Sequence, residues 1–229
     1  LCAAGTTTIT GTPNVGVCEL GDGGATDSLV VEALASLTAS SVLAVFVDAG
    51  NTAGSITNSG SISSFTKGSN FAIFLATGAS LTGAITNNSG GIIQAVNSDS
   101  SGFTGGSSAA AVALALMSGT GVAGGISNSG SILATNLRDL AGQTGSSPSM
   151  SPFSVEAVGV YNAGTITGSL ANNSSGVISA TATARVSDAD VTITYSAGSN
   201  AALAVGVLND GTITTDLFNS GSISANATA

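Results

Sequence analysis

Five times along the chain, an alternating apolar segment is followed by two short segments that each centre on one isoleucine. In the first unit the apolar segment covers residues 42–47, and Gly54-Ser-Ile56-Thr-Asn58-Ser-Gly60-Ser-Ile62 follows it. Apolar and polar residues that alternate are typical of β-strands, and glycine and asparagine favour the turns between strands. The other units cover residues 71–92, 111–132, 155–178 and 202–223. We therefore expect three short strands per unit.

The isoleucines of the short segments are expected to point inward, because their Ser and Thr neighbours lie on the opposite face of the strand. Stacked units would align two interior columns, one of Ile56, Ile85, Ile126, Ile166 and Ile213, and one of Ile62, Ile92, Ile132, Ile178 and Ile223. The outward neighbours would form a hydroxyl ladder of Thr57, Thr86, Ser127, Thr167 and Thr214. Corners are expected at Asn58, Asn128 and Asn219, whose side chains would satisfy the backbone of the turn.

A single unit buries too few apolar side chains to offset the entropy lost when its backbone is ordered. Stacking solves this problem, because each strand then bonds to the units above and below. The sequence thus predicts an all-β fold, a right-handed parallel β-helix (β-solenoid) of about five imperfect repeats. Extra residues at 63–70, 97–108, 136–153 and 181–200 are expected to project as loops, the last as a possible hairpin of residues 180–186 and 191–195.

The first 40 residues lack the repeated motif, and we expect them to form one or more N-terminal capping rungs. Residues 41–229 would form a single continuous solenoid, and its last strand, lacking a cap, would offer bare edges for pairing. Both cysteines, Cys2 and Cys18, lie in the cap. A disulfide between them would contribute about 3 kcal/mol and would fit an oxidising, secreted setting, whereas two buried free thiols are the alternative.

Charge narrows the possible partners. The chain has 3 Lys and Arg residues, 12 Asp and Glu residues and no histidine, which gives a net charge of −9. Binding to nucleic acid or to anionic lipid requires clustered bases, so we exclude both. The apolar run at residues 109–117 is far shorter than the ~20 residues that span a bilayer, so we expect no direct membrane insertion.

The same composition disfavours catalysis. A serine triad needs a histidine, and acid–base cleavage of polysaccharides on a β-helix needs acids clustered with bases. The pairs Asp22/Asp27 and Asp188/Asp190 could hold Ca²⁺, but we expect them to be solvated turn acids because the calcium-binding glycine repeat is absent. We therefore predict a protein that is not an enzyme and that uses no cofactor or metal.

The repeated G-x-I-x-N-S-G-x-I motif behind an alternating apolar strand, with a cysteine pair before the first repeat, resembles the passenger region of bacterial autotransporter proteins. The resemblance covers residues 40–229 and the cysteines. It implies a right-handed parallel β-helix that is secreted, displayed on the bacterial cell surface and often adhesive. The partners it implies are glycans or proteins of a host surface.

Two other functions are compatible with the pattern. Rods that stack end to end through the uncapped terminus would be filament subunits, with the chain itself as partner. Alternatively, the pairs Thr165/Thr167 and Thr212/Thr214 resemble a Thr-x-Thr ice-binding face, although the equivalent positions in the earlier units are irregular.

Overall fold

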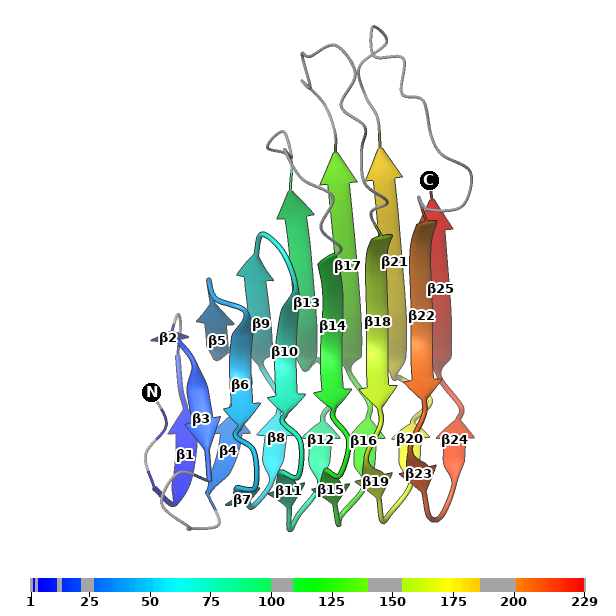
Figure 1. Ribbon diagram of the computed structural model, residues 1–229. Coiled ribbons are helices and arrows are strands. Elements are labelled where there is room, and N and C mark those ends of the chain that lie inside the picture. The colour runs from blue at the N-terminus through cyan, green and yellow to red at the C-terminus, as the bar shows by residue number, and fades with distance from the viewer. Residues whose placement is uncertain are drawn as a thin grey trace, which may run out of the picture.

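The computed structural model describes residues 2, 4–11, 14–21, 27–99, 109–139, 154–185 and 201–228. Every regular element in these residues is a β-strand, and every strand pair is parallel. The strands form four sheets that run side by side along one axis, so that the chain coils as a right-handed parallel β-helix (Figure 1). No helix in the described part of the chain is long and apolar enough to cross a membrane.

Two of the sheets, A and B, contain most of the short strands that centre on one isoleucine. Sheet A consists, in spatial order, of β1 (Thr6–Ile9), β4 (Ser28–Val31), β8 (Ile56–Asn58), β12 (Ile85–Asn87), β16 (Ile126–Asn128), β20 (Leu170–Asn172) and β24 (Leu217–Asn219). Sheet B consists of β2 (Asn14–Val15), β5 (Ser36–Ala39), β9 (Ser61–Thr66), β13 (Ile92–Asp99), β17 (Ser131–Asp139), β21 (Val177–Arg185) and β25 (Ser222–Thr228).

The other two sheets complete each turn of the coil. Sheet C contains the alternating apolar strands β3 (Cys18–Leu20), β6 (Leu43–Val47), β10 (Asn70–Leu75), β14 (Ala109–Leu116), β18 (Ser154–Asn162) and β22 (Ala201–Asn209). Sheet D contains the two-residue strands β7 (Thr52–Ala53), β11 (Ser80–Leu81), β15 (Gly121–Val122), β19 (Thr165–Ile166) and β23 (Thr212–Ile213). A complete rung therefore has four strands, and the prediction of three was wrong because strands this short carry only one inward side chain.

The fourth sheet splits the first predicted isoleucine column. Ile56, Ile85 and Ile126 stack in sheet A as predicted, but Ile126 is followed there by Leu170 and then Leu217. Ile166 and Ile213 belong instead to sheet D, where they continue the column of Ala53, Leu81 and Val122. A Thr-Ile-Thr segment has the same pattern in either sheet, so isoleucine alone could not assign it.

The second predicted column is wrong at one position. Ile62, Ile132, Ile178 and Ile223 stack in sheet B, but their neighbour in β13 is Ile93 and not Ile92. Ile93 is fully buried, whereas Ile92 points outward and is 36% exposed. The corner after Asn87 is longer than the corner after Asn58, and a shift of one residue moves a side chain to the other face of a strand.

The rungs widen along the solenoid, as the fan of strands in Figure 1 shows. In sheet C the strands lengthen from three residues in β3 to nine in β22, and sheet B widens in parallel from four residues in β5 to nine in β21. At about 3.3 Å per residue, this growth adds roughly 20 Å to the width of a rung.

The strand growth revises the loop prediction. Residues 181–185, expected in a loop or hairpin, are part of β21, whose two edges are both occupied by parallel partners, β17 and β25. The first arm of the predicted hairpin therefore has no free edge for an antiparallel partner. Its second arm, residues 191–195, lies outside the described residues, as do residues 100–108 and 140–153 of two other predicted loops. The loop predicted at 63–70 was wrong in part, because residues 63–66 belong to β9 and Asn70 begins β10.

Candidate functional site

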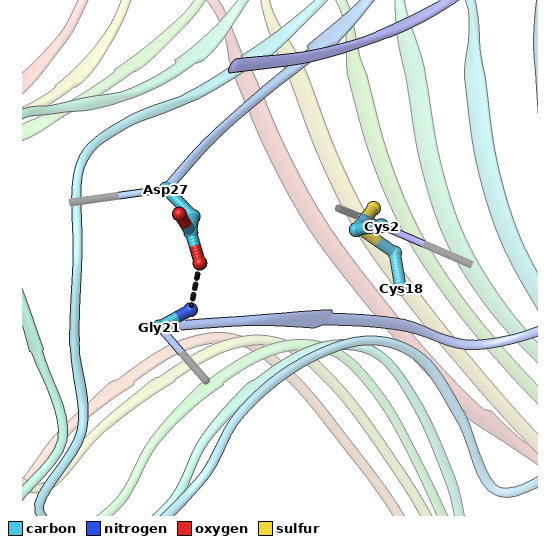
Figure 2. Close-up of a disulfide and its surroundings, with 4 residues drawn as sticks. All are labelled: Cys2, Cys18, Gly21 and Asp27. Atoms are coloured by element: carbon cyan, nitrogen blue, oxygen red, sulfur yellow. Dashed lines mark hydrogen bonds between the residues drawn. A yellow bond between two sulfur atoms is a disulfide. The ribbon is translucent and has the colours of Figure 1, made fainter. Parts of the chain in front are cut away.

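A disulfide cross-links the N-terminal rung. Cys2 and Cys18 form a disulfide with Cα atoms 5.0 Å apart, so the alternative of two free thiols is excluded (Figure 2). Cys18 lies at the start of β3 and is fully buried against the apolar interior. The disulfide thus ties the first residues of the chain to the first strand of sheet C.

A buried carboxylate reinforces this rung. Asp27, immediately before β4, is only 3% exposed. Its Oδ1 accepts a hydrogen bond from the Gly5 amide at 2.6 Å. Its Oδ2 accepts one from the Gly21 amide at 3.1 Å, which is the bond drawn in Figure 2. Its carbonyl oxygen accepts the Gly54 amide at 2.7 Å. The prediction of a solvated turn acid was wrong for Asp27, which connects three segments of the first rungs.

The described residues offer no support for the calcium alternative. Asp22, Asp188 and Asp190 lie outside the described residues. Within the described ranges, no group of three or more His, Cys, Asp or Glu side chains is placed to hold a metal ion.

A ladder of buried asparagines closes the corner between sheets A and B. Side-chain Nδ2 atoms donate to the Oδ1 of the next rung from Asn58 to Asn87 at 2.8 Å, from Asn87 to Asn128 at 2.8 Å, from Asn128 to Asn172 at 2.7 Å and from Asn172 to Asn219 at 2.8 Å. The first four members are at most 1% exposed, and Asn219 is exposed at the end of the ladder. The three predicted corner residues, Asn58, Asn128 and Asn219, are thus members of a five-residue ladder.

Each of the first four ladder amides also donates to a backbone carbonyl just after the corner of the next rung. Asn128 Nδ2, for example, donates to the Val177 carbonyl at 3.1 Å. The repeated glycine beside the ladder is required for space: a Cβ at Gly130 would lie well under 3.0 Å from the carbonyl oxygens of Gly91 and Asn88 in the rung before. Asparagine and glycine therefore specify one corner together, the first by its hydrogen bonds and the second by its lack of a side chain.

A second set of asparagines joins sheets B and C where the rungs widen. Asn97 Nδ2 donates to Asn136 Oδ1 at 2.9 Å, and Asn136 Nδ2 donates to the carbonyls of Ala109 and Glu156 at 2.7 and 2.8 Å. Both side chains are fully buried. The sequence analysis assigned these residues to loops, and their inward alternation with Ala95 and Ala134 is the signal that could have identified them.

The outer faces of sheets A and D only partly match the predicted hydroxyl ladder. Thr57, Thr86 and Ser127 do lie in register on sheet A, but Ala171 and Phe218 continue this row. Thr167 and Thr214 follow the strands of sheet D instead, and the Thr214 hydroxyl donates to the Thr167 carbonyl. The prediction was wrong for these two residues because Ile166 and Ile213 belong to sheet D.

On sheet D, the outward residues of successive strands are Thr52, Ser80, Gly121, Thr165 and Thr212. The two complete Thr-x-Thr pairs therefore lie on adjacent rungs. Gly121 and Ala123 interrupt the array in the preceding rung, so an ice-binding face would have regular hydroxyls on two neighbouring rungs only.

Sheet C has an outer face of a different kind. Its outward residues form a separate apolar cluster, which contains Val112, Ala115 and Val158 at its centre, and Phe71, Phe74, Ala110, Tyr161, Val205 and Leu208 around them. The sequence pattern described these strands only as alternating apolar segments, and it did not predict this outer surface.

Comparisons of the chain with protein-family models, with curated proteins and with solved structures give no match.

Proposed function

We propose that this chain is a secreted structural β-solenoid that is displayed on, or released from, a bacterial surface and presents its outer faces for adhesion. The observation that carries the proposal is the Cys2–Cys18 disulfide in the first rung. Disulfides of this structural kind persist in oxidising compartments and are rare in the cytosol. The disulfide and the Asp27 hydrogen bonds hold the first rung together, and they would keep this end of the rod ordered outside the cell, where ATP-dependent chaperones are absent.

The distribution of side chains supports a structural role. Columns of Leu, Ile and Val fill the interior, and buried Asn ladders fix the register of successive rungs. The buried polar side chains stabilise the stacking of the rungs. The outer faces of sheets A, B and D carry mainly Ser, Thr and other small residues, with Phe65, Ile92 and Phe218 as exposed exceptions. Such a rod holds flat faces at fixed spacing, which suits attachment to extended surfaces.

The proposal is tested in the producing cells. Antibodies against the purified chain should label intact, unpermeabilised cells or the culture medium, and the extracted protein should contain the Cys2–Cys18 disulfide by mass spectrometry without reduction. Beads coated with the folded chain should bind host cells or matrix glycoproteins in a saturable manner, whereas beads coated with the unfolded chain should not. Intracellular protein with reduced thiols would refute secretion, and equal binding of both kinds of bead would refute adhesion.

A filament built head to tail is the second proposal. In such a filament the rung of β22–β25, where Leu217 and Ile223 are 57% and 39% exposed, would stack on the first rung of the next copy. This proposal is weakened by the unequal ends, because the nine residues of β22 would meet the three of β3. Electron microscopy of native material separates the two proposals: long filaments support assembly, and short monodisperse rods support a displayed protein. An ice-binding role would require thermal hysteresis in the purified chain.

A further inference from the structure

The first rung, made of β1, β2 and β3, is joined to the rest of the solenoid by short stretches of backbone pairing. β1 pairs with β4 over four residues, β2 with β5 over two and β3 with β6 over three. In the described part of the chain, sheet D has no strand in this rung and begins at β7. Later rungs pair over longer stretches, and all nine residues of β17 are in register with β21. Local opening should therefore release the first rung most easily.

Few apolar side chains hold the first rung on the core. Its buried inward side chains are Ile9, Cys18 and Leu20, which are 6%, 0% and 0% exposed. Cys2 is half-buried and packs against the same cluster. The next rung contributes five fully buried side chains, Leu29, Val31, Leu37, Val45 and Val47. Opening the first rung would expose this apolar surface and the edges of β4, β5 and β6.

Two interactions join the same two parts of the first rung. The disulfide links Cys2, which precedes β1, to Cys18, the first residue of β3, so that the closed loop contains β1 and β2 (Figure 2). Asp27 accepts the Gly5 amide just before β1 at 2.6 Å and the Gly21 amide just after β3 at 3.1 Å. Because both interactions join β1 to β3, loss of the disulfide leaves the Asp27 hydrogen bonds to hold the rung.

We propose that the Cys2–Cys18 disulfide is a redox latch on the first rung. When both cysteines are reduced, the first rung opens while the rungs from β8 onward stay folded, and oxidation closes it. Closure is a thiol–disulfide exchange: the two thiols give two protons and two electrons to a disulfide-bonded oxidant, which leaves as two thiols. Oxidation closes the rung because it constrains a loop whose ends are 16 residues apart in the sequence.

The latch links the shape of this end of the rod to the compartment. A chain in a reducing compartment would have an open first rung, with the edges of β4, β5 and β6 unpaired on one side. A chain that reaches an oxidising compartment would close the rung there. This consequence rests on the proposed secretion, whereas the latch itself is a property of the purified chain.

Alkylation of Cys18 in the folded, reduced chain tests the proposal. A buried thiol is inert, so Cys18 reacts with iodoacetamide only when the rung opens. The chain is reduced, freed of reductant without oxygen and alkylated, and the rate is compared with the rate in urea. We expect Cys18 to be protected less than about tenfold. Cys2→Ser should give the same result without any reductant, because it leaves Cys18 as a free thiol.

The matched control is a buried thiol in the middle of the solenoid. Ala134→Cys, combined with Cys2→Ser and Cys18→Ser, places a thiol in β17 at a position that is 1% exposed. This thiol should be protected more than about a hundredfold under the same conditions. Circular dichroism shows whether each variant folds, and the reduced wild-type chain provides the test if Cys2→Ser does not.

Asp27→Asn provides a second readout, which a general loss of stability would not give. In the oxidised chain it should speed hydrogen exchange of the Gly21 amide at least about tenfold, because the Oδ2 acceptor is lost. In the reduced chain it should change this rate less than about twofold, because the rung is already open.

Protection of Cys18 by more than about tenfold in the reduced chain would overturn the proposal, since the rung would then stay closed without the disulfide. Equal acceleration of hydrogen exchange in β1 and in β16 on reduction would overturn it as well, because the disulfide would then hold the whole fold. Neither result bears on secretion, which the labelling of intact cells tests separately.

Discussion

Replacing Asn128 by alanine removes the middle of the asparagine ladder. Asn128 is fully buried and accepts from Asn87 Nδ2 at 2.8 Å, while its own Nδ2 donates to Asn172 Oδ1 at 2.7 Å and to the Val177 carbonyl at 3.1 Å. The substitution breaks all three bonds in one step. Asn219→Ala is the matched control, because Asn219 is exposed and accepts a single ladder bond from Asn172.

The expected cost follows from what remains buried. Each lost side-chain bond is worth about 0.5–1.5 kcal/mol, and a buried acceptor left without its donor costs about 1–3 kcal/mol more. Asn172 Oδ1 becomes such an acceptor, since its residue is 1% exposed. Asn87 Nδ2 keeps its bonds to the carbonyls of Gly91 and Ser131 and adds little to the cost. We expect Asn128→Ala to lower the free energy of unfolding by about 3–5 kcal/mol and Asn219→Ala by about 1 kcal/mol.

Urea unfolding followed by circular dichroism measures the total effect, and hydrogen exchange locates it. A solenoid can open locally, so the amides of the affected corners are the most sensitive reporters. The Ser129 amide donates to the Asn87 carbonyl at 2.7 Å and the Asn173 amide to the Asn128 carbonyl at 2.8 Å. A loss of 3 kcal/mol corresponds to about a hundredfold faster exchange at these positions if they open with the ladder.

The difference in the free energy of unfolding between Asn128→Ala and Asn219→Ala shows whether the buried ladder stabilises the corners. If Asn128→Ala costs no more than Asn219→Ala, the buried ladder does not stabilise the corners. Faster exchange spread evenly over the whole chain would also contradict a local role for the ladder.

Three further predictions test the corner glycines, the corrected register and the cap. Gly130→Ala should destabilise the chain by more than about 2 kcal/mol because its Cβ collides with the preceding rung, whereas Gly121→Ala, with its nearest neighbour at 3.8 Å, should be nearly neutral by urea unfolding. Ile93→Ala should cost about 2–5 kcal/mol and Ile92→Ala under about 1 kcal/mol, and the reverse order would contradict the register. Cys2→Ala should lower stability by about 3 kcal/mol, with exchange accelerated mainly in the N-terminal rungs.

The repeated apolar pattern was enough to predict a parallel β-helix. A segment with one inward isoleucine between hydroxyl residues buries too little to fold alone. Because the segment recurs, its copies can stack and bury their isoleucines together. The same pattern could not assign Ile166, because an inward apolar residue fits sheet A or sheet D equally well. Its place is set by backbone bonds such as the one from the Thr167 amide to the Val122 carbonyl at 2.9 Å.

The ladder asparagines would have been a better guide to register than the isoleucines. Asn87-Asn-Ser-Gly-Gly-Ile-Ile93 and Asn172-Asn-Ser-Ser-Gly-Val-Ile178 have the same length, and aligning them places Ile93 with Ile178 and Ile85 with Leu170. Leu and Ile can replace each other in an apolar column. A buried Asn amide, by contrast, needs a hydrogen-bond partner in the next rung at one fixed position. Polar residues with demanding hydrogen bonds therefore carry more register information than apolar ones.

The apolar outer face of sheet C could not be predicted from alternation. All eight residues of β14 are alanine, valine or leucine, so the two faces of the strand look alike in the sequence. Only the register with Phe71, Phe74 and Tyr161 shows which side chains gather outside. A strand that is apolar on both faces indicates that both faces are covered, but not by what.

A pair of engineered disulfides tests the four-sheet solenoid most directly. Cysteines at adjacent parallel positions about 4.8 Å apart fall within the distance range that a disulfide bridges. In the structure Ser127 is in register with Ala171, whereas a three-strand rung would set Ser127 beside Thr167. With oxidant, Ser127→Cys/Ala171→Cys should form an intramolecular disulfide and Ser127→Cys/Thr167→Cys should not, as measured by mass spectrometry after proteolysis. The opposite result would contradict the four-sheet register on which the whole account rests.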